Sequence, residues 1–126
     1  MPKILIVDDE PYVRLLIERT LEKLEDYGVE IEVTDNGATA LEMIRKSPPN
    51  LVFLDVMMPR MNGFDVCKAV KNDYGMKDVY IILLTAKGQE VDRKKGLEFG
   101  ADMYMTKPFS PDELVAKAIE VLKITL

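Results

Sequence analysis

The sequence is poorest in the residues that carry most metal and nucleophilic chemistry in proteins. It contains no histidine and one cysteine, Cys67. This composition excludes a zinc finger, a Ser-His-Asp triad, a Cys-His pair and a phosphohistidine within the chain. A chain of 126 residues is long enough to bury a core without disulfides or a structural zinc. We therefore expect Cys67 to be a reduced, inert residue of that core.

Long hydrophobic runs and an excess of positive charge are also missing. The longest apolar stretch, residues 79–84, is far too short to cross a bilayer, and no signal peptide precedes the first strand. Lys and Arg number 17 against 22 Asp and Glu, for a net charge of −5, which argues against nucleic-acid binding by this chain alone. We predict a cytoplasmic protein of one domain, residues 1–126, that binds no membrane.

Five short apolar runs mark the expected strands. Residues 3–7, 51–54 and 79–84 are continuous runs, as in strands buried on both faces of a parallel sheet. Residues 30–34 alternate, with Ile31 and Val33 on one face, as in a half-exposed edge strand, and residues 103–106 form the last strand. Short connections through helices then predict an α/β, flavodoxin-like (βα)5 fold. Its doubly wound parallel sheet of five strands has the order 2-1-3-4-5.

Helical patterns follow each strand. Ser110, with Glu113 three residues later, predicts a capping box before the last helix, and Pro111 suits its first position. The helix expected at residues 90–99 has a charged middle and a poor apolar stripe, so we expect it to be the loosest element. The expected helices begin near Pro11, Gly37, Phe64, Glu90 and Pro111.

Carboxylates stand at the carboxyl ends of two strands that the predicted order makes neighbours. Asp8 and Asp9 follow the first strand and Asp55 follows the third, so the three converge at the switch point of the sheet. Each pair would repel by about 4 kcal/mol at ~4 Å for an effective dielectric of ~20. Without histidine or a nearby thiolate, the expected counter-ion is a hard divalent cation, Mg²⁺ with Mn²⁺ as a substitute.

Simpler interpretations of these acids stay open. Asp55 would merely cap the helix that begins near Gly63, and the acid pair would merely interact with the helix dipole at Pro11. Pro59 and Gly63 shape the loop after Asp55, where Gly63 permits a backbone turn that other residues resist.

Thr85 and Lys107 stand at the ends of the fourth and fifth strands. A metal-bound carboxylate that faces a lysine and a hydroxyl suits phosphoryl transfer, with Asp55 as the nucleophile. Thr85 and the backbone N–H groups near Ala86 and Met57 would bind the phosphoryl oxygens, and Lys107 would pair with one of them. Taken singly, Thr85 is an ordinary strand-end hydroxyl and Lys107 a surface lysine.

Four motifs together carry a family resemblance. VDDEP, LDVMMPRMNG, LLTAKG and GADMYMTKPF occur in order and with matching spacing, and they resemble the receiver domain of two-component response regulators over essentially the whole chain. The resemblance implies that Asp55 is the phospho-acceptor. It also implies that Asp8 and Asp9 bind Mg²⁺ with Asp55 and the backbone carbonyl of Met57. The donor would be a phosphohistidine on a sensor histidine kinase or a phosphotransfer protein.

The resemblance further implies a switch and an output face. Thr85 and Tyr104 would move together, and the Lys107-Pro108 peptide bond would be cis. An effector protein or a missing output domain would read the face of the fourth helix, fifth strand and fifth helix, and a phosphorylation-dependent homodimer could form there. The domain would catalyse its own phosphorylation and slow dephosphorylation while acting primarily as a signalling switch.

Met57 and Lys87 occupy positions that vary in this family and are thought to tune loss of the phosphoryl group. An apolar Met57 cannot activate water as a carboxylate could, so we expect a slowly hydrolysed phosphoaspartate. A haloacid-dehalogenase-like phosphotransferase would need a second aspartate where Met57 stands. Flavin binding is disfavoured because Asp8 and Asp9 would repel the flavin phosphate. A phosphorylation-independent interaction module is the remaining alternative.

Overall fold

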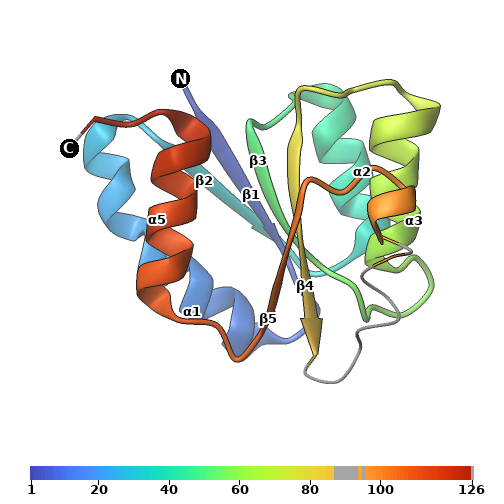
Figure 1. The fold of residues 1–126 in the computed structure, drawn as a ribbon, viewed down its shortest axis with the longest axis horizontal. Coiled ribbons are helices and arrows are strands. Elements are labelled where there is room, and N and C mark those ends of the chain that lie inside the picture. Colours follow the sequence, from blue (N-terminus) through green and yellow to red (C-terminus); the bar gives the residue numbers. More distant parts are fainter. Residues whose placement is uncertain (87–93, 95, 126) are drawn as a thin grey trace.

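A parallel five-stranded sheet forms the centre of the molecule. The computed structural model describes residues 1–86, 94 and 96–125. The strands pair in the order β2-β1-β3-β4-β5, all parallel, which confirms the predicted flavodoxin-like topology (Figure 1). Their bounds are β1 (Lys3–Val7), β2 (Glu30–Thr34), β3 (Leu51–Asp55), β4 (Tyr80–Ala86) and β5 (Met103–Lys107).

Helices cover both faces of this sheet. Figure 1 shows α1 and α5 on one side and α2 and α3 on the other. Half of the helix expected at residues 90–99 falls outside the described residues, and so does the prediction that it is the loosest element. The bounds are α1 (Pro11–Leu21), the 3₁₀ turn η1 (Glu22–Tyr27), α2 (Gly37–Lys46), α3 (Gly63–Lys68), the π-helical turn η2 (Ala69–Asp73) and α5 (Pro111–Leu122). No helix among the described residues is long and apolar enough to cross a membrane.

Alternation along the central strands divides the core in two. Ile4 and Ile6 of β1 pack with the helices of one face, in a cluster that includes Ile17 and Leu114. Their neighbours Leu5 and Val7 belong to the other cluster, which includes Ile44, Phe64 and Cys67. Successive side chains of a strand point to opposite faces, so a continuous apolar run is what a sheet covered on both sides requires. Cys67 is the core residue that its sequence context predicts.

Two local predictions differ from the structure, and a third is confirmed. β4 continues through Thr85 and Ala86, because these residues pair with Thr106 and Lys107 of β5. The half-exposed edge strand predicted at residues 30–34 is confirmed, since β2 lies at the edge of the sheet, where Ile31 is partly buried and Val33 is 38% exposed. Ser110 is the N-cap of α5 with Pro111 in the first turn, yet its side chain makes no capping hydrogen bond within the described chain, so the predicted capping box is wrong.

The loop between β3 and α3 is shaped differently from the prediction. The left-handed backbone conformation falls on Arg60, with φ 68°, and not on Gly63. A Cβ at Gly63 would clash with the backbone carbonyl oxygen of Asp55 and approach the Cα of Val56 to 2.9 Å. Gly63 is therefore required for a close approach of two backbone segments, which its amide closes by donating to the carbonyl of Val56 at 3.0 Å.

An ion pair between a buried lysine and an exposed aspartate joins the amino ends of β4 and β5. The Lys71 ammonium, in η2, lies 2.8 Å from Oδ2 of Asp102, the residue before β5. The same oxygen accepts a hydrogen bond from the amide of Ile81, in β4, at 2.8 Å. Lys71 also donates to the carbonyl of Lys77 at 3.1 Å. One buried cation thus links three segments at the end of the sheet opposite Asp8 and Asp55.

Candidate functional site

Four carboxylates meet at the carboxyl ends of β1 and β3. These strands are neighbours in register, with Val7 opposite Leu54, so the residues that follow are brought together. One oxygen from each of Asp8, Asp9, Glu10 and Asp55 lies within 4.8 Å of the others. Asp8 and Asp55 are 0% and 3% exposed. The convergence predicted for three carboxylates is present, and Glu10 is a fourth member that sequence reasoning missed.

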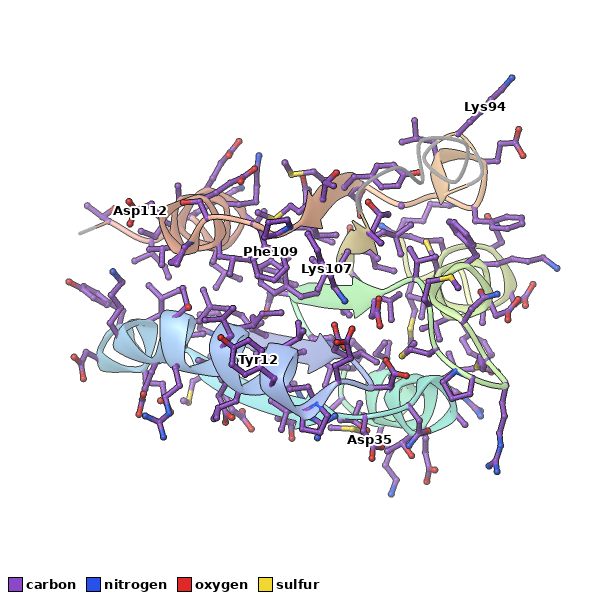
Figure 2. The ribbon with its side chains drawn as sticks, turned by 90° about the horizontal axis from the view of Figure 1, so that it is seen from below. Tyr12, Asp35, Lys94, Lys107, Phe109 and Asp112 are labelled. Atoms are coloured by element: carbon purple, nitrogen blue, oxygen red, sulfur yellow. The ribbon has the colours of Figure 1, made fainter. Side chains whose placement is uncertain are left out.

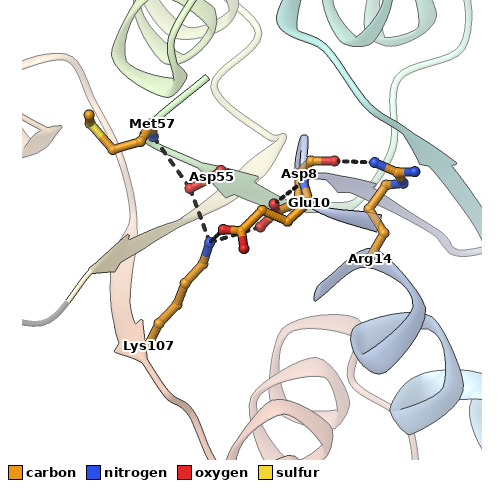
Figure 3. A network of polar contacts seen from close by, with 6 residues as sticks. All are labelled: Asp8, Glu10, Arg14, Asp55, Met57 and Lys107. Atoms are coloured by element: carbon orange, nitrogen blue, oxygen red, sulfur yellow. Dashed lines mark hydrogen bonds and ion pairs between the residues drawn. The ribbon is translucent and has the colours of Figure 1, made fainter. Parts of the chain in front are cut away.

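Lys107, at the end of β5, points its ammonium into this cluster. Its Nζ lies 3.0 Å from Asp8 Oδ2, 3.3 Å from Asp55 Oδ1 and 3.5 Å from Glu10 Oε1 (Figure 3). Burial by itself lowers the pKa of Lys107, but the neighbouring Asp8 and Asp55 outweigh it, and the pKa is raised. Lys107 therefore stays fully charged at neutral pH. The peptide bond that follows, Lys107–Pro108, is cis.

The acidity of Asp55 is strongly perturbed. Burial, reinforced by the charge of Asp8, raises the pKa of Asp55 from 3.8 to about 7, although Lys107 opposes the shift. Without a further cation, Asp55 is therefore protonated in a large fraction of the molecules near neutral pH. A cation that neutralises the cluster would release this proton and restore the nucleophilic carboxylate.

Local contacts hold the acid pair in place. The side chain of Asp8 accepts a hydrogen bond from the Glu10 amide at 2.9 Å. Arg14, one turn into α1, donates to the Asp8 carbonyl at 2.8 Å. These contacts fix the backbone between β1 and α1, so the Asp8 carboxyl group stays at the strand end. Arg14 has no signal in the sequence, because its partner is a backbone atom.

The cluster has the composition and size of a Mg²⁺ site. All its donors are oxygens, which Mg²⁺ prefers, and two oxygens on opposite sides of the ion are about 4.2 Å apart, given Mg–O distances of ~2.1 Å. Asp8 Oδ2 is buried and, although it is ion-paired with Lys107, it has no hydrogen-bond partner among the described residues. This oxygen is available to a cation or to its water ligands. The residues present therefore fit the ion.

The remaining predicted residues lie just after β3, at the end of β4 and within β5. The Met57 amide donates to Asp55 Oδ1 at 3.3 Å, while its side chain is exposed. Thr85 is buried near the end of β4, and Ala86 is its exposed last residue. Tyr104 is buried in β5 opposite Leu83, where a Cβ on Gly96 would lie 2.6 Å from its hydroxyl. The cap interpretation of Asp55 is wrong, since Asn62 caps α3 in a capping box with Asp65.

An apolar groove opens beside Lys107. It measures about 290 Å³ and is bordered by α1, the end of β4 and the segment after β5. In Figure 2, Tyr12 of α1 and Phe109, which precedes α5, both lie close to Lys107, and all three residues border the groove. Its lining residues are Tyr12, Val13, Leu16, Ala86, Lys107, Pro108 and Phe109.

Comparisons with known proteins agree with this geometry. The family model described as "Response regulator receiver domain" matches residues 4–119. "Probable transcriptional regulator ycf27" of Porphyra purpurea is 47% identical over 121 residues, which cover 96% of this chain and 47% of that protein. The "Alkaline phosphatase synthesis transcriptional regulatory protein PhoP" of Bacillus subtilis (strain 168) is 41% identical over 121 residues, 96% of this chain and 48% of its own length.

Solved structures give the same result. Chemotaxis protein CheY4 of Vibrio cholerae matches with a TM-score of 0.83 and 33% identity, covering 96% of this chain and 98% of that chain. The receiver domain of Francisella response regulator 1452 matches with a TM-score of 0.83 and 30% identity, covering 98% of both chains. These matches do not favour a haloacid-dehalogenase-like enzyme or an unrelated interaction module.

The match to the curated relatives is limited to part of their length. This chain spans about half of each of the two relatives, 47% and 48%. The family model covers residues 4–119 of this chain. The chain belongs to the receiver domain family of two-component response regulators.

Proposed function

We propose that Asp55 accepts a phosphoryl group from a phosphohistidine on a partner histidine kinase or phosphotransfer protein. A carboxylate oxygen of Asp55 forms a bond to phosphorus, the phosphorus–nitrogen bond of the donor breaks, and the imidazole leaves. The observation that carries this proposal is a buried carboxylate at a strand end with an ammonium group 3.3 Å from its Oδ1. Receiver domains as a family interact with histidine kinases and effector domains.

The chain's own residues have distinct tasks in this reaction. Lys107 pairs with a phosphoryl oxygen, and Thr85 with the amides of Met57 and Ala86 donates hydrogen bonds to the others. Asp8, Asp9, Asp55 and the Met57 carbonyl hold the divalent cation. When bound, Mg²⁺ supplies positive charge that offsets the acidic cluster and the phosphoryl oxygens.

The test is incubation with acetyl phosphate and Mg²⁺, followed by intact mass measurement. We expect the mass of one phosphoryl group to be added, and the adduct to be lost under conditions that hydrolyse acyl phosphates. Steady release of inorganic phosphate from a phosphomonoester would instead indicate a phosphatase and overturn the proposal.

Removal of divalent cations should stop the reaction. With a chelator in excess, we expect phosphorylation by acetyl phosphate to slow by about 100-fold or more, because the acid cluster then repels the donor. Mg²⁺ in excess of the chelator should restore the rate, and Mn²⁺ should replace it. The measurement is the initial rate of adduct formation, and an unchanged rate in chelator would contradict the assignment of the metal site.

Thr85→Ala should separate phosphorylation from switching. We expect adduct formation within about fivefold of wild type, the cost of one hydrogen bond, but loss of the phosphorylation-dependent change at Tyr104. The measurement is the shift of the Tyr104 ring resonances on adding acetyl phosphate. Thr106→Ala is the matched control, because Thr106 is the register partner of Thr85 on β5 and is exposed. Equal shifts, or equal effector binding, in phosphorylated Thr85→Ala and wild type would refute the switch.

Met57→Asp should shorten the phosphorylated state. A carboxylate two residues after the acceptor can activate water, and we expect the lifetime to fall about tenfold or more. The lifetime is followed by intact mass after acetyl phosphate is removed. An unchanged lifetime would show that Met57 does not limit hydrolysis.

We assign the phosphoryl donor and the effector to two different surfaces of the molecule. A protein donor must place its phosphohistidine within reach of Asp55, and we assign its contact to the apolar groove that Tyr12, Phe109 and Lys107 border. The effector or output domain reads the face made by the helix expected at residues 90–99, β5 and α5, where a phosphorylation-dependent homodimer also forms. In this proposal residues 1–126 make up one receiver domain, which catalyses its own phosphorylation and slow dephosphorylation.

A further inference from the structure

Met57 is the exposed methionine nearest in sequence to the acceptor. The chain has eight methionines, and two of them, Met1 and Met57, are exposed, whereas the others are buried or half-buried. Met57 is 59% exposed and its neighbour Met58 is 7% exposed. A thioether is oxidised by agents in solution, so these adjacent residues should react at very different rates.

Met57 lies next to the phosphorylation site through its backbone. Its backbone amide donates to Asp55 Oδ1 at 3.3 Å. Figure 3 shows the side chain extending from that point away from the carboxylate. The side chain has three rotatable bonds, and the backbone amide anchors the residue at the acceptor. We expect a polar side chain at this position to reach water next to the acceptor.

We propose that Met57 is an oxidation site through which a hydroperoxide shortens the phosphorylated state. The inference rests on the proposed role of Asp55 as acceptor. In the reaction, the thioether sulfur attacks the hydroperoxide, the O–O bond breaks and an S–O bond forms. Sulfur is oxidised by two electrons, and the hydroperoxide is reduced to water or an alcohol.

The product, methionine sulfoxide, is polar and its oxygen accepts hydrogen bonds. A thioether does this weakly, so the sulfoxide can orient a water molecule that attacks the aspartyl phosphate. One additional hydrogen bond of modest strength should speed hydrolysis, so we expect the lifetime of the phosphorylated state to become about two- to tenfold shorter. Methionine sulfoxide reductases reverse the modification, which makes the effect of an oxidant on the signal reversible.

The test compares oxidised and untreated protein. The unphosphorylated chain is treated briefly with hydrogen peroxide, the peroxide is removed, and peptide mapping locates the sulfoxides. We expect Met57 and Met1 to react before Met58. Both samples are then phosphorylated with acetyl phosphate and the adduct is followed by intact mass. Met57→Leu, which keeps Met1 and the other methionines, is treated in the same way and compared with its own untreated form.

The outcomes separate this inference from the proposed function. A two- to tenfold faster decay in oxidised wild type, no change in treated Met57→Leu and recovery after reductase treatment would support it. Equal decay with Met57 fully oxidised, the same acceleration in Met57→Leu, or Met58 reacting first would overturn it. A lack of any adduct in the untreated protein would instead refute Asp55 as acceptor.

Discussion

Asp55→Asn should abolish the phosphoryl adduct. The amide has no carboxylate oxygen to attack phosphorus, and no other carboxyl group of the cluster combines deep burial with a contact to both Lys107 and the Met57 amide within the described residues. Asn is nearly isosteric, so the fold should be kept. The measurement is intact mass after incubation with acetyl phosphate and Mg²⁺, where we expect less than about 1% of the wild-type adduct, a loss of at least the 100-fold typical of a missing catalytic group.

A matched control tests whether the loss is specific. Asp35 is an exposed carboxylate that follows β2 and lies outside the cluster of four acids. Asp35→Asn makes the same chemical change and should be phosphorylated as wild type is. An adduct that persists in Asp55→Asn would place the acceptor elsewhere and end the assignment.

Without divalent cations, the stability of the wild type should fall as pH rises. The folded-state pKa of Asp55 is about 7 against 3.8 for the ordinary group, so the folded state binds more protons between these values. Its contribution to the free energy of unfolding is therefore full below about pH 4 and is lost as pH rises through about 7. About three pKa units correspond to roughly 4 kcal/mol.

Asp55→Asn should remove most of this pH dependence. We expect the variant to be more stable than wild type by a few kcal/mol at pH 8 in chelator, with the difference shrinking toward pH 4. Mg²⁺ should also reduce the difference, because it binds the folded wild type and stabilises it. Urea midpoints at several pH values measure the effect, with Asp35→Asn as control. Parallel pH profiles for Asp55→Asn and wild type would contradict the shifted pKa.

The sheet and its charged edge could be predicted because their signals are strong and local. Residues 3–7 and 51–54 are uninterrupted apolar runs that end at Asp8 and Asp55, and burial on both faces leaves few alternatives to a central parallel strand. Strand order then follows from the edge character of residues 30–34, and the strand order is enough to bring the acids together.

The missed features depend on contacts that leave no pattern in the sequence. Glu10 joins the cluster because the chain turns after Asp9, and exposed acids next to a turn are common. Gly63 is required by the approach of Asp55's backbone, whereas sequence reasoning assigned it a turn that Arg60 in fact makes. At Ser110 the sequence motif for a capping box is present, but the motif alone does not determine whether the serine side chain forms the capping hydrogen bond.

The ion pair between the buried Lys71 and the more exposed Asp102 distinguishes the two ends of β4 and β5. It ties η2, β4 and β5 where the last two strands begin, while Thr85 and Lys107 lie where those strands finish. We therefore expect a shift at the carboxyl ends of β4 and β5 to be taken up along the strands, because their amino ends are tied together.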